Sequence, residues 1–184
     1  MKFFDNYLKE MVDGLLSVDK NLLEAAAKLL MEVSAGGGKV IIAGNGGSAA
    51  MASHTAVDLT KNAQVRSINF NESDLITCFA NDFGYEKWIE KSLEYYADPG
   101  DSVILISSSG SSINILNAAD KAKKMGLKLI TFSGFSPDND LRDKGDLNFY
   151  CESQEYNVVE MSHHIWLVAI VDRIIDLQSV SSAV

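Results

Sequence analysis

The chain has 184 residues, 47% of them hydrophobic and 22% charged, a balance that is typical of a folded globular domain. Its 25 acidic and 16 basic residues give a net charge of −9, which argues against nucleic acid as a partner because phosphate backbones attract basic surfaces. The longest apolar runs, such as 165–171, are too short to span a bilayer, and the first residues lack the pattern of a signal peptide. We therefore expect a cytoplasmic protein with no membrane partner, in which Cys78 and Cys151 stay reduced.

Two helices are predicted before the first strand. Apolar residues at helical spacing place them over 3–17 and 20–34, and a run of three glycines ends the second helix. The first helix has a broad apolar stripe and no sheet before it. We therefore expect residues 1–34 to lie at the interface of a homo-oligomer, a tetramer or at least a dimer.

Strands and helices alternate through the rest of the chain. The predicted strands are 39–43, 65–70, 103–106, 127–132 and 146–151. The predicted helices are 49–61, 74–80, 85–96, 112–124 and 158–177. This order predicts a single doubly wound α/β domain over residues 1–178 with a parallel sheet, followed by a frayed tail at 179–184. Ligands of such sheets bind beyond the carboxyl ends of the strands.

Two loops of small residues lie at this predicted edge. Gly44-Asn45-Gly46-Gly47-Ser48 follows the first strand, and Ser107-Ser108-Ser109-Gly110-Ser111-Ser112 follows the strand at 103–106. Each loop leads into a helix, whose N-terminal N–H groups and dipole favour an anion. The first loop has neither the glycine spacing of a dinucleotide site nor the lysine of a Walker loop, so no nucleotide cofactor is expected. On its own, the serine loop fits a helix-capping turn equally well.

Histidines and carboxylates occur together at helical spacing in two places. His54 and Asp58 share one face of the helix after the glycine loop, and Glu160 is followed by His163 and His164 in the last helix. Such side chains transfer protons or bind a divalent metal. The structural alternatives are a hydrogen bond on the helix surface for the first pair and, for one of the two neighbouring histidines, a core position with a hydrogen bond to a backbone carbonyl.

The ordered combination of these motifs resembles the sugar isomerase (SIS) domain family and, over nearly the full chain, its phosphoheptose isomerase group. The matching pieces are the N-terminal helices, Asn45-Gly46-Gly47-Ser48, His54, Leu59-Thr60, Asn81-Asp82-Phe83-Gly84-Tyr85 and the serine loop. The resemblance implies a five-stranded flavodoxin-like parallel sheet and a homotetramer with sites at subunit interfaces. It also implies a sugar-phosphate substrate similar to sedoheptulose 7-phosphate.

The resemblance further implies roles for individual residues. Ser107, Ser108, Ser109 and Ser112 fall on the phosphate-binding loop of the family. The positions on the sugar side are Asn45, Gly46, Gly47, Ser48 and Asp82. A zinc ligand of some members matches His54, so the candidate metal ligands are His54, Asp58, Glu160 and His164.

Two departures from the family concern proton transfer. Asp58 stands where the isomerases have a glutamate. If Glu160 is aligned with the glutamate that follows the family's glutamine, Val159 replaces that glutamine and Leu167 replaces the catalytic histidine. We therefore predict Asp58 or Glu160 as the catalytic base. His54 or one of the neighbouring histidines 163 and 164 would be the acid, and the choice falls on His163, one turn before Leu167.

The predicted activity is the interconversion of a ketose phosphate and an aldose phosphate through an enediol. A base would remove the proton beside the carbonyl, and an acid or a cation would stabilise the enediolate oxygens. The alternative is a non-catalytic phosphosugar-binding protein that acts as a regulator or adaptor, of the kind that binds a bacterial replication initiator. The altered proton-transfer positions favour this alternative, whereas the histidines and Glu160 favour an enzyme.

Overall fold

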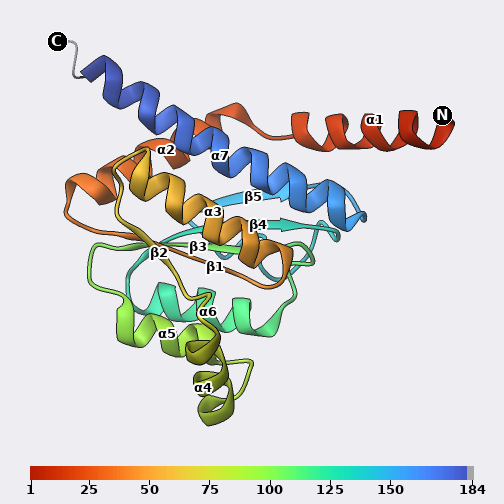
Figure 1. Ribbon diagram of the computed structural model, residues 1–184. Helices are drawn as coiled ribbons and strands as arrows, with labels where there is room; N and C mark the ends of the chain where they lie inside the picture. Colours follow the sequence, from red (N-terminus) through yellow and green to blue (C-terminus); the bar gives the residue numbers. More distant parts are fainter. Residues whose placement is uncertain (182–184) are drawn as a thin grey trace.

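The computed structural model describes residues 1–181 and contains a five-stranded sheet with helices on both faces (Figure 1). The strands are β1 (Val40–Gly44), β2 (Ser67–Asn69), β3 (Ser102–Ser107), β4 (Lys128–Gly134) and β5 (Leu147–Cys151). Their order is β2-β1-β3-β4-β5 and every pairing is parallel, as predicted for a flavodoxin-like sheet. All six residues of β3 are buried, because this central strand is covered on both faces.

Seven helices occur within residues 1–181. They are α1 (Lys2–Leu16), α2 (Lys20–Ala35), α3 (Gly47–Lys61), α4 (Ser73–Phe83), α5 (Trp88–Tyr96), α6 (Ile113–Lys124) and α7 (Tyr156–Ser181). Figure 1 shows α2, α3 and α7 on one face of the sheet and α5 and α6 on the other. Each face has its own apolar core, with Trp166 and Phe132 in the first and Ile89 and Leu93 in the second.

The last helix is longer than predicted. It begins two residues earlier, at Tyr156, and residues 179–181 continue it instead of forming a tail. The chain has no glycine or proline there to end a helix, and the Ser179 hydroxyl donates to the Asp176 carbonyl at 2.7 Å. The remaining predicted tail residues, 182–184, lie outside the described part of the chain. No described helix is long and apolar enough to cross a membrane.

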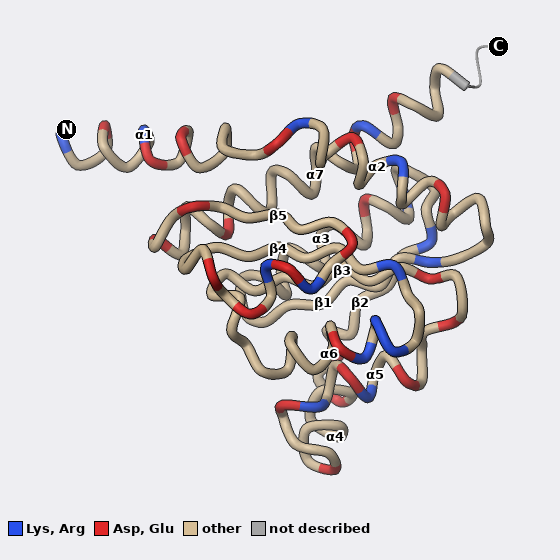
Figure 2. Tube along the Cα trace, turned by 180° about the vertical axis from the view of Figure 1, so that it is seen from behind, with Lys and Arg blue, Asp and Glu red and all other residues tan. Residues whose placement is uncertain are grey.

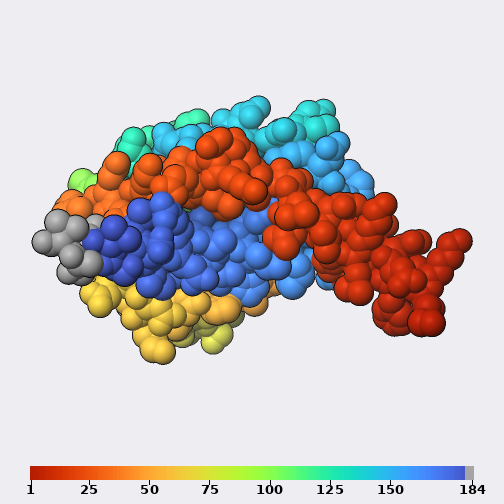
Figure 3. Space-filling view, turned by 90° about the horizontal axis from the view of Figure 1, so that it is seen from above, coloured from red at the N-terminus to blue at the C-terminus, as the bar shows by residue number. Residues whose placement is uncertain are grey.

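Helix α1 extends beyond the body of the molecule (Figures 1 and 3). Its one buried residue is Gly14, and a Cβ there would lie 2.6 Å from Cγ1 of Val158 on α7. The glycine therefore allows the close approach of α1 to α7. Five large apolar side chains of α1 are at least half exposed: Phe3, Phe4, Leu8, Val12 and Leu16.

Candidate functional site

The two small-residue loops line one cavity of about 280 Å³ at the carboxyl edge of the sheet. The loops follow β1 and β3, which are hydrogen-bonded neighbours, so parallel pairing places them side by side. The predicted binding residues that line the cavity are Asn45, Gly46, Gly47, Ser48, Ser107, Ser108, Ser109 and Ser112. The lining is completed by Ile106, Tyr156 and Glu160.

The serine loop is shaped by Gly110 and by hydrogen bonds within the loop. Gly110 has φ +65°, and its N–H donates to the Ser107 carbonyl at 3.0 Å. The Ser107 hydroxyl donates to the Ser112 hydroxyl at 3.1 Å and so joins the two ends of the loop. Because Ser112 makes no side-chain capping bond within the described chain, the first N–H groups of α6 are left for a ligand.

One buried hydroxyl in this loop adds to the capacity for hydrogen bonding. Oγ of Ser108 is buried and has no hydrogen-bond partner among residues 1–181. Buried polar atoms are normally paired, so an unpaired one beside a cavity fits a ligand contact. Together with the N-terminus of α6, the loop forms an anion cradle.

Cationic side chains do not contribute to this cradle. No lysine or arginine lines the cavity in the part of the chain that the structure describes. Figure 2 shows basic residues gathered elsewhere, including the last turn of α6 with Lys121, Lys123 and Lys124. An anion in the cavity would therefore be held by amides, hydroxyls and the helix dipole, as the acidic composition of the chain implied.

The glycine loop brings α3 and α7 together at the cavity. Gly46, the residue before α3, has φ +55° and ψ −121°, a combination that in practice requires glycine. A Cβ at Gly47 would overlap the carboxylate of Glu160. Glycine at this position therefore lets the Glu160 side chain lie against the loop, where it supplies the one carboxylate among the described residues of the cavity lining.

Asn45 is fixed by two residues to which the sequence analysis gave no role. Its side-chain amide forms a reciprocal pair with that of Asn114, with N···O distances of 3.0 and 2.9 Å. The Tyr85 hydroxyl donates to the same Asn45 oxygen at 3.1 Å. Asn114 is buried in the first turn of α6, and no spacing rule singles it out in the sequence. Only the approach of α6 to the glycine loop reveals this contact.

Beyond the cavity, α3 and α7 bring His54, Asp58 and His164 together. Nδ1 of His54 lies 2.8 Å from Nε2 of His164, and Nε2 of His54 lies 3.2 Å from Oδ2 of Asp58. An ionised carboxylate can only accept, so with both rings neutral His54 donates to Asp58 and accepts from His164. The remaining ring nitrogen of His164, Nδ1, then carries a lone pair. This arrangement is a relay of one carboxylate and two imidazoles.

Burial lowers the pKa of His164, and the neighbouring His54 lowers it further, whereas Asp58 opposes both effects. His164 is four residues after Glu160, so both side chains project from the same face of α7. A helix rises 1.5 Å per residue, which puts the relay about 6 Å along α7 from Glu160. A ligand that extends from the serine loop along the contact between α3 and α7 would meet Glu160 first and the relay next.

The predicted metal ligands do not fit a metal ion in this arrangement. Within residues 1–181, no three His, Cys, Asp or Glu side chains are placed to hold one. Glu160, the fourth predicted ligand, lies against the glycine loop.

His163 lies in the core, and this placement overturns its assignment as the catalytic acid. The side chain is fully buried, and its Nε2 lies 3.0 Å from the Ser133 carbonyl oxygen. Burial lowers the pKa of His163 to about 4. Leu167 is buried on the same side of α7, while Glu160 and His164 face α3. His163 is thus the core histidine of the structural alternative, and His164 is the histidine on the side of the site.

Asp82 is not among the described residues that line the cavity. It is exposed near the end of α4, where it accepts a hydrogen bond from the Asn81 side chain at 2.9 Å. The resemblance placed it on the substrate side, but α4 packs against α5 on the other face of the sheet from α3 and α7 (Figure 1).

The fold and both loops agree with a known family. The model of the SIS domain matches residues 3–134, which include the glycine loop, the serine loop and β1 to β4. The chain belongs to the SIS domain family. Its solved relatives share the fold: the structure of a phosphoheptose isomerase from Neisseria gonorrhoeae superposes with a TM-score of 0.86 at 23% identity, over 94% of this chain and 97% of that one.

Two curated relatives of this SIS-domain protein are more similar in sequence. The phosphoheptose isomerase of Aliarcobacter butzleri is 32% identical over 150 residues, which are 78% of this chain and 76% of that protein. The phosphoheptose isomerase of Mycobacterium tuberculosis is 33% identical over 166 residues, 85% of this chain and 84% of that protein. The similarity to the phosphoheptose isomerase group is therefore found in sequence as well as in fold.

Proposed function

We propose that this SIS-domain protein is a phosphosugar isomerase that interconverts a ketose phosphate and an aldose phosphate, with a substrate similar to sedoheptulose 7-phosphate. The observation that carries the proposal is the position of Glu160, whose carboxylate shares one cavity with the serine loop. A phosphate cradle and a base are the two elements that the reaction needs in one place. The names of the curated relatives support the heptose phosphate as substrate.

In this proposal the phosphate binds to the serine loop. Hydroxyls of Ser108, Ser109 and Ser112 and the N–H groups at the start of α6 donate to its oxygens, and the helix dipole favours its charge. Oδ1 of Asn45 already accepts from Asn114 and Tyr85, so Asn45 would donate its second side-chain N–H to a sugar hydroxyl. The carbon chain then extends past Glu160 toward His164.

Glu160 would act as the base. Its carboxylate takes the proton from the hydroxyl-bearing carbon beside the ketose carbonyl, and the electron pair of that C–H bond forms the double bond of the enediolate. Glu160 then returns the proton to the former carbonyl carbon, which completes the aldose. One proton thus moves between adjacent carbons, with no net change in the protein.

His164 would move the second proton, between the two oxygens. Its Nδ1 lone pair accepts the proton of the hydroxyl group that becomes the aldehyde and delivers it to the enediolate oxygen. While His164 is positively charged, His54 and Asp58 stabilise it, because Asp58 is the negative end of the relay. Asp58 in this scheme orients His54 and does not touch the substrate.

The direct test is to incubate the purified protein with sedoheptulose 7-phosphate and to follow formation of the aldose phosphate. We expect turnover by the wild type and a loss of at least about 10²-fold in the Glu160→Gln variant, because the amide cannot take the proton. The variant should still bind inorganic phosphate, since the serine loop is unchanged. Turnover that survives in Glu160→Gln would contradict the assignment of the base.

A regulator or adaptor that binds a phosphosugar without turning it over is the second candidate. It is favoured by one observation, namely that no imidazole lines the cavity in the described chain and His163 is in the core. Tight binding of the sugar phosphate without any formation of product would support this candidate over the isomerase.

A further inference from the structure

Phe135 has an unusual backbone conformation close to the cavity. It follows β4 and has φ +58°, which a residue with a bulky side chain rarely adopts. Within the described chain the one other such residue that is not glycine is Gln64, with φ +54°. Gln64 lies three residues after Lys61, the last residue of α3, in the turn that ends this helix, where a left-handed residue is common. Phe135 ends a strand, so its conformation needs another explanation.

Phe135 is held in this conformation from both sides. Its N–H donates to the Ser153 carbonyl at 3.0 Å, and its own carbonyl accepts from the Tyr150 hydroxyl at 2.9 Å. The guanidinium of Arg142 lies over the Tyr150 ring, 3.8 Å from its centroid. These contacts fix the direction in which the Phe135 side chain leaves the backbone.

The Phe135 side chain supports Tyr156. The two rings meet edge to face, with centroids 4.7 Å apart and planes at 83°, a preferred arrangement for an aromatic pair. Tyr156 is the first residue of α7 and lines the cavity together with the serine loop and Glu160. Tyr156 is nevertheless 61% exposed. Packing of Tyr156 into the core therefore does not explain why Phe135 is held against it.

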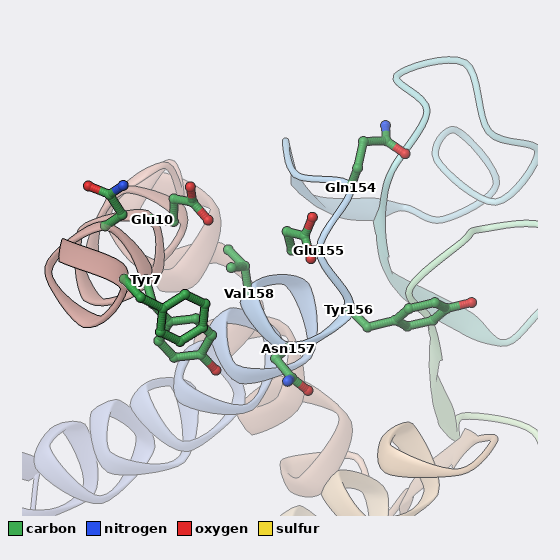
Figure 4. A pocket seen from close by; sticks show the side chains of 9 residues that line it. Tyr7, Glu10, Gln154, Glu155, Tyr156, Asn157 and Val158 are labelled. Carbon is green, nitrogen blue, oxygen red and sulfur yellow. The ribbon is translucent and has the colours of Figure 1, made fainter. Parts of the chain in front are cut away.

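The direction of the Tyr156 side chain agrees with a role at the cavity. A second groove, of about 510 Å³, lies between α1 and the start of α7 and includes Tyr7 and Tyr156 in its lining. Figure 4 shows the Tyr156 side chain pointing away from α1 and Tyr7. The residue therefore lies between the groove and the cavity, with its ring turned from the helix that borders the groove.

We infer that Phe135 holds Tyr156 in place as a sugar-recognition residue, whose ring packs against the carbon chain of a sugar phosphate bound at the serine loop. A tyrosine suits this ligand because its ring face is apolar and its hydroxyl can pair with a sugar hydroxyl. The inference rests on the proposed function, since it requires a sugar phosphate in the cavity. It adds a determinant of affinity for the sugar that is separate from the phosphate cradle.

The test compares binding of sedoheptulose 7-phosphate with binding of inorganic phosphate by calorimetry. In the Tyr156→Ala variant we expect the affinity for the sugar phosphate to fall about tenfold, as for the loss of one aromatic contact. The affinity for inorganic phosphate should stay within about twofold, because the serine loop is intact. Tyr156→Phe keeps the ring and should retain most of the sugar-phosphate affinity. The matched control is Tyr95→Ala, since Tyr95 is similarly exposed, at 68%, and lies on α5.

The supporting role of Phe135 is tested by Phe135→Gly, in which glycine adopts the same φ without strain. We expect a weaker affinity for the sugar phosphate and an unchanged affinity for inorganic phosphate. Gln64→Gly is the control, because it relieves the same kind of backbone strain away from the cavity and should leave both affinities unchanged.

The outcomes separate the inference from the function on which it rests. Wild-type affinity for the sugar phosphate in Tyr156→Ala would overturn the inference alone. A wild-type protein that binds inorganic phosphate but not the sugar phosphate would overturn both the substrate class and the inference.

Discussion

His54 on α3 and His164 on α7 face each other with 2.8 Å between Nδ1 and Nε2, and Asp58 lies 3.2 Å from the other ring nitrogen of His54. This contact joins two residues that are 110 positions apart in the sequence. His164 is the histidine of α7 that faces α3. It is therefore the one that can act on a ligand bound between the two helices. The proposed transfer of a proton between oxygens depends on it.

Replacement of His164 tests this relay. His164→Asn should lower turnover of sedoheptulose 7-phosphate by about 10²-fold or more, because the amide cannot carry the proton between the two oxygens. The affinity for inorganic phosphate should not change. Steady-state kinetics and calorimetry on the same preparation measure both effects. Full turnover in this variant would exclude His164 from the reaction.

The relay also predicts the pH dependence of activity. The proposed step needs neutral His164, and burial together with the neighbouring His54 lowers its pKa from the ordinary 6.5. Activity should therefore be lost on acidification with a midpoint below 6.5, and His164→Asn should remove this limb from its residual activity. A wild-type midpoint above that value would contradict the assignment.

Removal of one hydroxyl from the serine loop should weaken phosphate binding. Ser109→Ala is expected to cost about 1–3 kcal/mol of sugar-phosphate affinity, because a hydrogen bond to a charged group is lost. Ser111→Ala is the matched control, since Ser111 belongs to the same loop but does not line the cavity. Equal affinities of the two variants for inorganic phosphate, measured by calorimetry, would show that the cradle lies elsewhere.

Gly47→Ala should displace the carboxylate of Glu160, the proposed base. The new methyl group would overlap the side chain of Glu160, which must then move away from the glycine loop. We expect turnover to fall by about 10²-fold, as for a misplaced catalytic group, while the protein stays folded. At Gly36 a Cβ would make only ordinary contacts, at 3.5 Å, so Gly36→Ala should keep wild-type kinetics and thermal stability.

Buried His163 predicts a loss of stability in acid. Its pKa is about 4 in the folded protein and 6.5 for an ordinary histidine, so the unfolded chain binds a proton in this range that the folded protein does not. The contribution of neutral His163 to the free energy of unfolding is complete above pH 6.5. It is lost as the pH falls toward 4, which lowers the free energy of unfolding by roughly 3 kcal/mol in total. Urea unfolding at several pH values should show this slope in the wild type and a smaller one in His163→Gln. The same slope in both proteins would contradict burial of a neutral imidazole.

The exposed apolar side chains of α1 predict a homo-oligomer. Phe3, Phe4, Leu8, Val12 and Leu16 form more apolar surface than a monomer normally leaves in water. Light scattering at micromolar concentration should give a mass well above the 20.1 kDa of one chain. The double variant Phe4→Glu/Leu8→Glu should reduce that mass, since buried charges oppose association. A wild-type mass near that of one chain would refute the prediction.

The sequence by itself determined the architecture and the two loops of the cavity. Short apolar runs that alternate with amphipathic helices predict a parallel sheet. The runs are apolar on both faces of a strand, and the helices have one apolar face that covers the sheet. The small residues after 43 and 106 mark places where the backbone is open to a ligand, and parallel pairing of β1 and β3 necessarily brings those places together. Local pattern and strand order were sufficient for this part of the site.

Only the tertiary structure decided which side chains of α7 face the cavity. Glu160, His163, His164 and Leu167 follow one another within eight residues, and the helix carries apolar residues on every side, so periodicity does not give its rotation. The rotation follows from packing: Trp166 and Leu167 enter the core, His163 goes with them, and Glu160 and His164 turn to α3. Contacts between distant segments, such as Asn45 with Asn114 and Phe135 with Tyr156, likewise arise from how the helices and loops pack on the sheet, which no local spacing encodes.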